Sequence, residues 1–181
     1  MMIRDFNLLA TADNINRSQA CSELWMLLRA VGDEAPKVDR SPIKGLITAR
    51  TNLDPQEAIR RLREELHEKT DHFRVLLRVM PIEVRVPTAL EEIKEASRML
   101  ASKITEEESY RITVEKRRTN LRSLEVIDAV AEGIERRVDL EAPDWVLLIE
   151  IIGGTTGISV IPADGILNVQ KERAALPPKG H

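Results

Sequence analysis

The sequence has few of the residues that several common functional sites require. Its 181 residues include one cysteine, Cys21, which excludes a disulfide framework and a cysteine-based zinc site. The longest uninterrupted apolar run, Trp145 to Ile149, is too short to cross a bilayer. Arg4 and Asp5 interrupt the N-terminus, and no signal-peptide pattern follows them. Together these absences predict a cytoplasmic protein without a membrane partner.

Aromatic residues and excess positive charge are also scarce. The chain has two Phe, two Trp and one Tyr, too few to build a platform on which single-stranded bases stack. Its 27 basic residues face 30 acidic ones, so the net charge is -3 and the chain as a whole is not a basic nucleic-acid binder. If it binds RNA, it must use a local basic patch that recognises phosphates and shape.

Residues 1–86 alternate between strand and helix patterns. Apolar stretches over residues 6–12, 43–51 and 73–86 predict strands, and the last is interrupted at Pro81 because proline cannot donate to a central ladder. Two helix patterns lie between these stretches, and a strand pair is expected near residues 36 to 50. This succession predicts a ferredoxin-like βαββαβ unit.

The two helix patterns in this half carry clear end signals. The first has apolar residues at steps of three and four and stops at Gly32. The second begins at Asp54, a predicted N-cap, with Pro55 at the first helical position and Glu57 three residues after the cap.

Residues 87–170 form a second predicted domain. Thr88 and Glu91 match a capping box, residues 110–115 alternate like a half-buried strand, and Ser123 is placed to cap a second helix. The apolar run from Trp145 predicts a central strand, and a glycine-rich turn then predicts a hairpin. Residues 171–181 are expected to be a mobile tail. The whole chain is therefore predicted to be α+β, a ferredoxin-like unit followed by a second α/β domain.

The densest group of positive charges lies between residues 111 and 122. Five basic residues there are opposed only by Glu115, namely Arg111, Lys116, Arg117, Arg118 and Arg122. The window spans the end of a predicted strand and the start of a helix, where arginine side chains and free amides can bind phosphate together. A solvated loop that balances the acidic run 106–108 explains the same charges equally well.

A second basic stripe is possible in the first half. Lys44 and Arg50 flank the predicted strand at 43–51, and Arg74 and Arg78 share one strand parity. All of them are candidates for phosphate contacts, although the solvent face of a half-buried sheet is the favoured explanation.

The sequence shows no recognisable catalytic or cofactor site. The glycine-rich turn at 153–157 lacks the spacing of a phosphate loop. His67 and His72 are five residues apart, which is not a metal-binding spacing on a helix. No carboxylate pair or Ser–His arrangement stands out. We therefore predict no catalytic residues, no metal and no cofactor.

Four motifs follow one another in the second half. Tyr110–Asn120 precedes a helix pattern, a Val-Asp-Leu…Pro-Asp motif occupies residues 138–144, Gly-Ile-Ser-Val follows at 157–160, and Ile-Leu-Asn closes the set at 166–168. As an ordered set, and with Arg-Val-Met-Pro-Ile-Glu at 78–83, they resemble the THUMP domain, a module of tRNA-modifying proteins. The resemblance covers about residues 75–170, so the second predicted domain, 87–170, is identified as a THUMP domain. A ferredoxin-like unit is its usual companion.

The resemblance implies that the two domains together bind tRNA, at its acceptor stem and single-stranded 3′ end, and that DNA is not a partner. The residues that match the family's basic segment by position are Lys116, Arg117, Arg118 and Asn120. With Arg122, Lys44, Arg50 and Arg78 they make up the predicted RNA contacts.

The chain carries no recognisable thiouridylase, methyltransferase or pseudouridine-synthase motif after these residues. It therefore resembles the stand-alone members whose relatives assist cytidine acetylation of tRNA by a separate acetyltransferase. The expectation is a non-catalytic adaptor. Two alternatives remain open at this point: an RNA-modifying enzyme subunit with an unrecognised active site, and a module that binds a small molecule or another protein.

Overall fold

The computed structural model describes residues 2–13 and 17–178, which form two compact units. Unit 1 contains the described residues up to Pro81 and those from Ile166 onward, and unit 2 contains Ile82–Gly165. Each unit has its own sheet and its own hydrophobic core, which confirms the predicted α+β class. None of the helices in the described part of the chain is long and apolar enough to cross a membrane.

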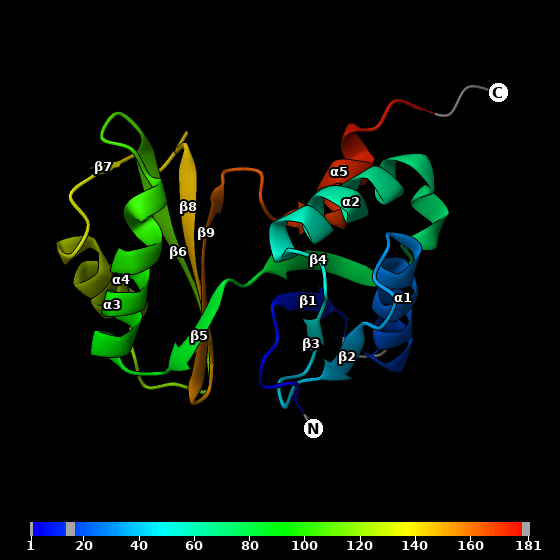
Figure 1. Cartoon of the computed structure of the whole chain (residues 1–181), viewed down its shortest axis with the longest axis horizontal. Coiled ribbons are helices and arrows are strands. Elements are labelled where there is room, and N and C mark those ends of the chain that lie inside the picture. The colour runs from blue at the N-terminus through cyan, green and yellow to red at the C-terminus, as the bar shows by residue number, and fades with distance from the viewer. Residues whose placement is uncertain (1, 14–16, 179–181) are drawn as a thin grey trace. The chain divides into compact units, whose positions relative to one another are not determined.

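Unit 1 folds around a five-stranded antiparallel sheet (Figure 1). Its elements are β1 (Leu8–Ala12), α1 (Arg17–Ala30), β2 (Lys37–Arg40), β3 (Leu46–Arg50), α2 (Pro55–Glu68), a short 3-10 helix (Thr70–His72), β4 (Leu76–Pro81), β10 (Leu167–Asn168) and α5 (Val169–Ala175). The strand order is β10-β4-β1-β3-β2, and each neighbouring pair is antiparallel. The order β4-β1-β3-β2 is that of the predicted ferredoxin-like unit.

Helices α1 and α2 pack on the same face of this sheet. Leucines of both helices meet small and branched residues of the central strands in one fully buried cluster. The predicted start of α2 is confirmed, because a carboxylate oxygen of Asp54 accepts the Glu57 amide at 3.0 Å with Pro55 at the first position. Gly32 ends the turn after α1 at φ 113°, a conformation that favours glycine.

The C-terminal segment completes unit 1. Strand β10 pairs with β4, and α5 follows it directly. Glu172 of α5 binds two residues of α2, Arg63 Nε at 2.6 Å and His67 Nε2 at 2.9 Å. The compact units thus differ from the predicted boundaries at both ends of the second domain. Residues 82–86, predicted in the first domain, belong to unit 2, whereas residues 166–170, predicted in the second domain, and the described part of the predicted tail belong to unit 1. Of that predicted tail, residues 179–181 lie outside the described residues.

Unit 2 contains a mixed five-stranded sheet. Its elements are β5 (Val84–Pro87), α3 (Leu90–Leu100), a short 3-10 helix (Ala101–Lys103), β6 (Ser109–Arg117), α4 (Ser123–Glu132), β7 (Arg137–Val138), β8 (Trp145–Ile152) and β9 (Thr155–Pro162). The strand order is β5-β9-β8-β6-β7. The apolar strand β8 lies at the centre, parallel to β6 and antiparallel to β9, as the run of buried residues predicted.

Helices α3 and α4 cover one face of the unit 2 sheet (Figure 1). Tyr110 and alternate residues of β8 and β9 form the core beneath them. Two predicted caps differ in the structure. The N-cap of α3 is Ala89, while the Thr88 hydroxyl lies 2.8 Å from the Thr156 hydroxyl. The N-cap of α4 is Arg122, and Ser123 is the first helical residue. In both cases the hydroxyl residue lies one position away from the cap.

Candidate nucleic-acid interface

The predicted basic window lies where β6 ends and α4 begins. Here we define the basic segment as residues Lys116–Arg122. Arg117, near the start of the segment, is fixed twice: its backbone is bound by the turn that follows β8, and its side chain is bound by β8. The amide of Gly153 donates to the Arg117 carbonyl at 2.9 Å, and Arg117 Nη1 donates to Glu150 Oε2 at 2.6 Å. Glu150 is fully buried and the Arg117 side chain is 19% exposed, so this ion pair is largely buried.

The rest of the basic segment is ordered by local hydrogen bonds. Arg118 has φ 54°, a left-handed conformation that is uncommon for a residue with a side chain, and the chain bends here as it leaves β6. The Thr119 hydroxyl accepts the Leu121 amide at 3.2 Å, and the Leu121 carbonyl accepts Lys116 Nζ at 3.2 Å. The Arg122 amide then donates to Glu125 Oε1 at 3.3 Å, which starts α4.

This geometry separates the predicted contacts in unit 2 into two groups. Four of the side chains are exposed, namely Lys116, Arg118, Asn120 and Arg122. Arg117 is the fifth, and its guanidinium points to a carboxylate rather than to solvent. This differs from the expectation that Arg117 contacts a phosphate. Arg111, which belongs to the same charge window, donates from Nη1 to the Leu140 carbonyl at 3.1 Å.

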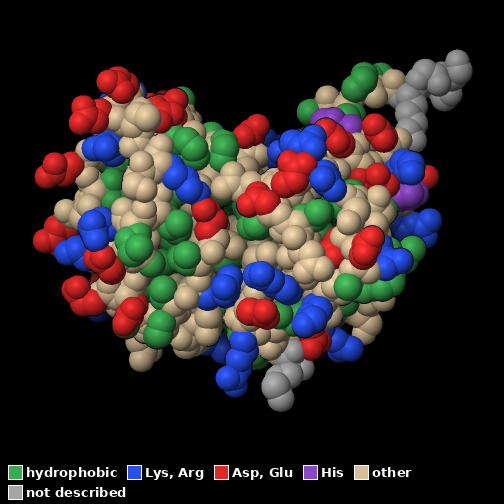
Figure 2. All heavy atoms as spheres, viewed as in Figure 1, with side chains coloured by type: hydrophobic (Ala, Val, Ile, Leu, Met, Phe, Trp, Pro, Cys, Tyr) green, Lys and Arg blue, Asp and Glu red, His purple; other side chains and the backbone are tan. Residues whose placement is uncertain are grey.

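The local positive charge is smaller than the sequence window predicts. Glu150 reaches the segment from β8, 33 residues away in the sequence, and Glu125 lies in the first turn of α4. Figure 2 shows the same mixture on a larger scale, with Lys and Arg side chains interspersed among Asp and Glu on the visible face. A polyanion site here therefore depends on a few well-placed cations rather than on a broad positive surface.

The residues of the Val-Asp-Leu…Pro-Asp motif shape the loop between β7 and β8. An oxygen of Asp139 accepts the amides of Glu141 and Ala142 at 3.0 Å each, and these bonds lower the pKa of Asp139. An oxygen of Asp144 accepts the Ser109 amide at 2.8 Å, which joins the loop to the start of β6. These motif residues thus hold β6 in place beside β8.

The three predicted contacts of the first half all belong to unit 1. Lys44 is exposed in the turn between β2 and β3, and Arg50 Nη1 donates to the Asp5 carbonyl at 3.3 Å. Arg78 is half-buried in β4, paired with Thr11 of β1.

Arg74 and Arg78 do not share one strand face, although the sequence predicts that they do. Arg74 precedes β4, and the register between β1 and β4 shifts at Thr11/Ala12, so alternation is broken there. No continuous stripe through these two arginines forms.

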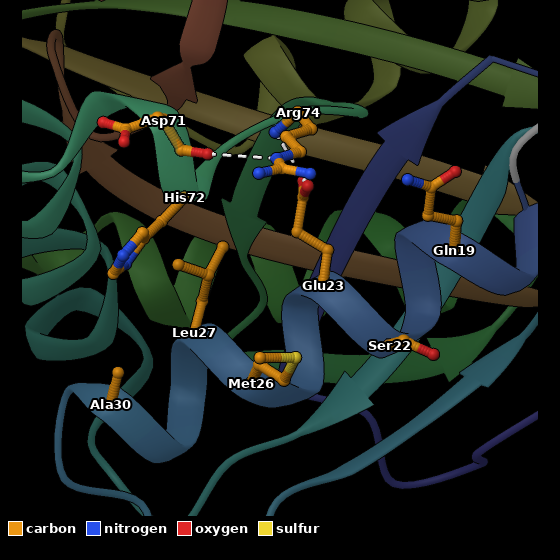
Figure 3. Close-up of a pocket in the computed structure, with 9 residues that line it drawn as sticks. All are labelled: Gln19, Ser22, Glu23, Met26, Leu27, Ala30, Asp71, His72 and Arg74. Atoms are coloured by element: carbon orange, nitrogen blue, oxygen red, sulfur yellow. Dashed lines mark hydrogen bonds between the residues drawn. The ribbon is translucent and has the colours of Figure 1, made fainter.

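Unit 1 also has a pocket of about 440 Å³ beside α1, shown in Figure 3. Met26, Leu27 and Ala30 supply its apolar surface, and Arg74 lies at its rim. Glu23 points from α1 to the chain before β4, where its carboxylate accepts the amides of Arg74 at 2.7 Å and Leu76 at 2.9 Å. That carboxylate therefore anchors the start of β4. Sequence reasoning gave no signal for this pocket.

Within residues 2–13 and 17–178, no group of three His, Cys, Asp or Glu side chains is arranged to hold a metal ion. The two histidines that the sequence analysis weighed each bind a carboxylate. His67 binds Glu172, and His72 Nδ1 lies 3.2 Å from Glu65 Oε1. The described residues thus present cations and an apolar pocket as candidate binding features.

Residues 87–161, which contain the basic segment, match the family model of the THUMP domain. Over those residues, the match confirms the predicted THUMP domain. The matched range ends before β10, in agreement with the structural division that assigns β10 to unit 1.

Solved structures share the fold. The chain is similar to PH1313 from Pyrococcus horikoshii Ot3, with a TM-score of 0.64, 22% identity, and coverage of 87% of this chain and 55% of that one. TrmN from Thermus thermophilus gives a TM-score of 0.54 at 19% identity, and the match covers 84% of this chain and 44% of TrmN. A 4-thiouridine synthetase in complex with RNA and ATP gives a TM-score of 0.52 at 15% identity, and the match covers 89% of this chain and 44% of the synthetase.

The chain thus spans about half the length of these structures. At these identities the likeness establishes the fold. No curated protein matched the sequence.

Proposed function

We propose that this protein binds tRNA through the basic segment of its THUMP domain. The observation that carries the proposal is that the exposed cations Lys116, Arg118 and Arg122 lie on a segment ordered by hydrogen bonds, within the range that matches the family. An ordered segment loses less conformational entropy on binding than a flexible one. A structural neighbour that is a 4-thiouridine synthetase in complex with RNA supports the same class of ligand.

The composition of the protein fits recognition of a folded RNA stem. A-form helices present phosphates and 2′-hydroxyls rather than readable major-groove edges, so aromatic platforms are not needed. With few exposed cations on the basic segment, we expect modest affinity and a shallow salt dependence, because each phosphate contact releases about one counterion.

Charge reversal of Arg118 and Arg122 tests the proposal. The variant R118E/R122E should bind total tRNA at least about tenfold more weakly, and the slope of log affinity against log salt should fall by about two. The measurement is a gel shift or fluorescence titration at two salt concentrations.

The matched control is R98E/R137E, which changes the charge of two exposed arginines of unit 2 by the same amount. Equal weakening by both variants would show that net charge rather than the basic segment governs binding. Unchanged affinity of R118E/R122E would overturn the proposal.

The proposal extends to the acceptor stem and 3′ end as the part of tRNA that is bound, with Lys44, Arg50 and Arg78 of unit 1 as additional contacts. A tRNA that lacks its 3′-terminal CCA should bind more weakly than the intact molecule. If affinity is unchanged, recognition of the 3′ end fails while RNA binding stands.

We also propose that the protein is a non-catalytic adaptor that presents tRNA to a separate modifying enzyme, a cytidine acetyltransferase by the resemblance to stand-alone THUMP proteins. The test incubates the purified chain with tRNA, ATP and acetyl-CoA, with and without the acetyltransferase. The adaptor role requires acetylation only in the presence of both proteins. Modification by this chain alone would make it an enzyme.

The pocket beside α1 supports a second candidate function, binding of a small apolar molecule. Its volume of about 440 Å³ is within the range of small-molecule sites, and Met26 is 65% exposed at its surface. The anionic apolar dye ANS is a suitable probe. Saturable binding by the folded protein that Met26→Glu abolishes would support this candidate, and absence of ANS binding would argue against it.

A further inference from the structure

The ion pair between Arg117 and Glu150 indicates that Arg117 has a different role from the other cations of the basic segment. The Arg117 guanidinium donates to the carboxylate of Glu150, and the pair is largely buried. Removing two charges from water is costly, and a surface phosphate contact does not require it. An arginine whose sole task was to bind phosphate would have no need of a buried glutamate.

The pair lies where it can control the direction of the basic segment. Arg117 and Glu150 are on the sheet face that does not carry α3 and α4, because the alternate residues of β6 and β8 form the core under those helices. The side chain of Arg117 is drawn towards β8, and its carbonyl is bound by the Gly153 amide. The next residue, Arg118, immediately adopts its left-handed conformation. The guanidinium and the backbone carbonyl of Arg117 are therefore both fixed at the point where the chain leaves the sheet.

We infer that Arg117 and Glu150 form a positioning pair, which holds the basic segment so that Arg118 and Arg122 meet the RNA while Arg117 does not. This inference rests on the proposed RNA-binding function. Arg117 acts through its neighbours, since its guanidinium binds Glu150, and Glu150 is part of the RNA site without contacting the ligand.

The variant E150Q gives opposite results under the two possible roles of Arg117. It keeps the size and one acceptor oxygen of the side chain but removes a negative charge. If Arg117 is a phosphate contact, loss of that charge frees the guanidinium and tightens tRNA binding. If the pair positions the segment, loss of the ion pair loosens residues 118–122 and weakens binding, by about fivefold with an unchanged salt slope. The sign of the change decides between them.

The matched control is E141Q, which removes one negative charge from an exposed loop residue of the same unit. Its effect on tRNA affinity measures the purely electrostatic part of the change. Thermal melting of E150Q confirms that the variant is folded under the conditions of the titration. Equal or tighter binding by E150Q than by E141Q would overturn the inference.

A second variant covers the case in which E150Q does not fold. R117M/E150L replaces both members by apolar residues and leaves the net charge unchanged, a replacement that proteins often tolerate. The positioning role predicts a salt slope equal to that of the unmodified protein. A slope reduced by about one would show that Arg117 itself neutralises a phosphate and would overturn the inference.

Hydrogen exchange separates failure of this inference from failure of the proposed function. In the RNA-free protein, E150Q should raise the exchange rate of the amides between Arg118 and Arg122 more than that of the amides in α3. If the unmodified protein binds no tRNA, the proposed function fails, and the exchange rates alone decide whether the pair fixes the segment. Unchanged exchange in E150Q would overturn the positioning role.

Discussion

The two units each contain an ion pair between an arginine and a glutamate that are far apart in the sequence. In unit 1, Arg63 Nε lies 2.6 Å from Glu172, and in unit 2, Arg117 Nη1 lies 2.6 Å from Glu150. The distances are the same but the surroundings differ. The Glu172 side chain is 20% exposed, whereas Glu150 is fully buried. The distance between the charged groups alone therefore does not determine how much either pair contributes to the stability of its unit.

The difference in burial assigns the two pairs different roles. Water still reaches both members of the pair in unit 1, whose side chains are 24% and 20% exposed, and it screens the attraction between the two charges. Loss of one member of a buried pair leaves a charge that neither water nor a partner compensates. The pair in unit 1 thus adds a modest contribution to the packing of α5, whereas the pair in unit 2 makes a larger contribution to the stability of the end of β6.

The largest expected effect is the loss of Arg117 in unit 2. Arg117→Met leaves the buried Glu150 carboxylate without its guanidinium and should lower the free energy of unfolding of unit 2 by about 3–5 kcal/mol. Urea denaturation measures this loss in a W25F background, where the remaining Trp145 reports on unit 2. The double variant R117M/E150L should recover most of the loss.

Arg63→Met in unit 1 provides the comparison. In a W145F background, where Trp25 reports on unit 1, it should cost less than about 1 kcal/mol. Equal losses for Arg63→Met and Arg117→Met would break the contrast between the two pairs.

A smaller effect is expected from Glu23, which stabilises unit 1 through hydrogen bonds to amides. Its carboxylate accepts the amides of Arg74, Val75 and Leu76 at the start of β4. Glu23→Ala leaves these donors without that acceptor and should cost about 2 kcal/mol, the range measured for hydrogen bonds to charged groups.

Hydrogen exchange of the three amides, together with urea denaturation in the W145F background, measures the effect of Glu23→Ala. Glu23→Gln is the control because it keeps one acceptor oxygen. The stability of unit 1 in this variant should lie between that of the unmodified protein and that of Glu23→Ala. A loss of stability without faster exchange at residues 74–76 would show that packing of α1, rather than these bonds, is responsible.

Local signals predicted much of the fold. The Asp54-Pro55-Glu57 start of α2 and the buried run of β8 depend on residues next to one another in the sequence, so periodicity and capping rules apply to them directly. The Thr88 and Ser123 caps were each placed one residue away from the observed N-cap, because several residues near a helix start satisfy the same pattern.

The role of Arg117 and the place of the C-terminal segment depend on distant contacts, which the sequence patterns do not include. Glu150 changes the role of Arg117 from 33 residues away, and no charge count within a window includes it. Similarly, Glu172 docks α5 on Arg63 across 109 residues, so a polar C-terminal segment that resembles a tail is part of unit 1. The sequence predicts the RNA contacts as a cluster, and the tertiary structure is needed to show which members are exposed and that Arg117 is bound to a buried carboxylate.

The smallest effect concerns Glu172 and pH. Burial alone raises the pKa of Glu172, but the hydrogen bonds from His67 and Arg63 outweigh it, so its pKa lies below the ordinary value of 4.5. A carboxyl whose pKa is lowered on folding contributes stability above the unfolded pKa and loses it as pH falls through the folded pKa. The docking of α5 should therefore be constant near neutrality and weaken below about pH 4.5.

Glu172→Gln should remove this acid-dependent part, with a difference of less than about 1 kcal/mol at neutral pH because the site is partly exposed. Amide chemical shifts of α5, followed by NMR between pH 7 and pH 3, measure the docking, and Glu68→Gln on the exposed end of α2 is the control. If the docking of α5 in the E172Q variant is lost at the same pH as in the unmodified protein, carboxyls other than Glu172 govern the loss of docking. In that case the surface pair in unit 1 contributes even less than its geometry indicates, which would widen the contrast with Glu150.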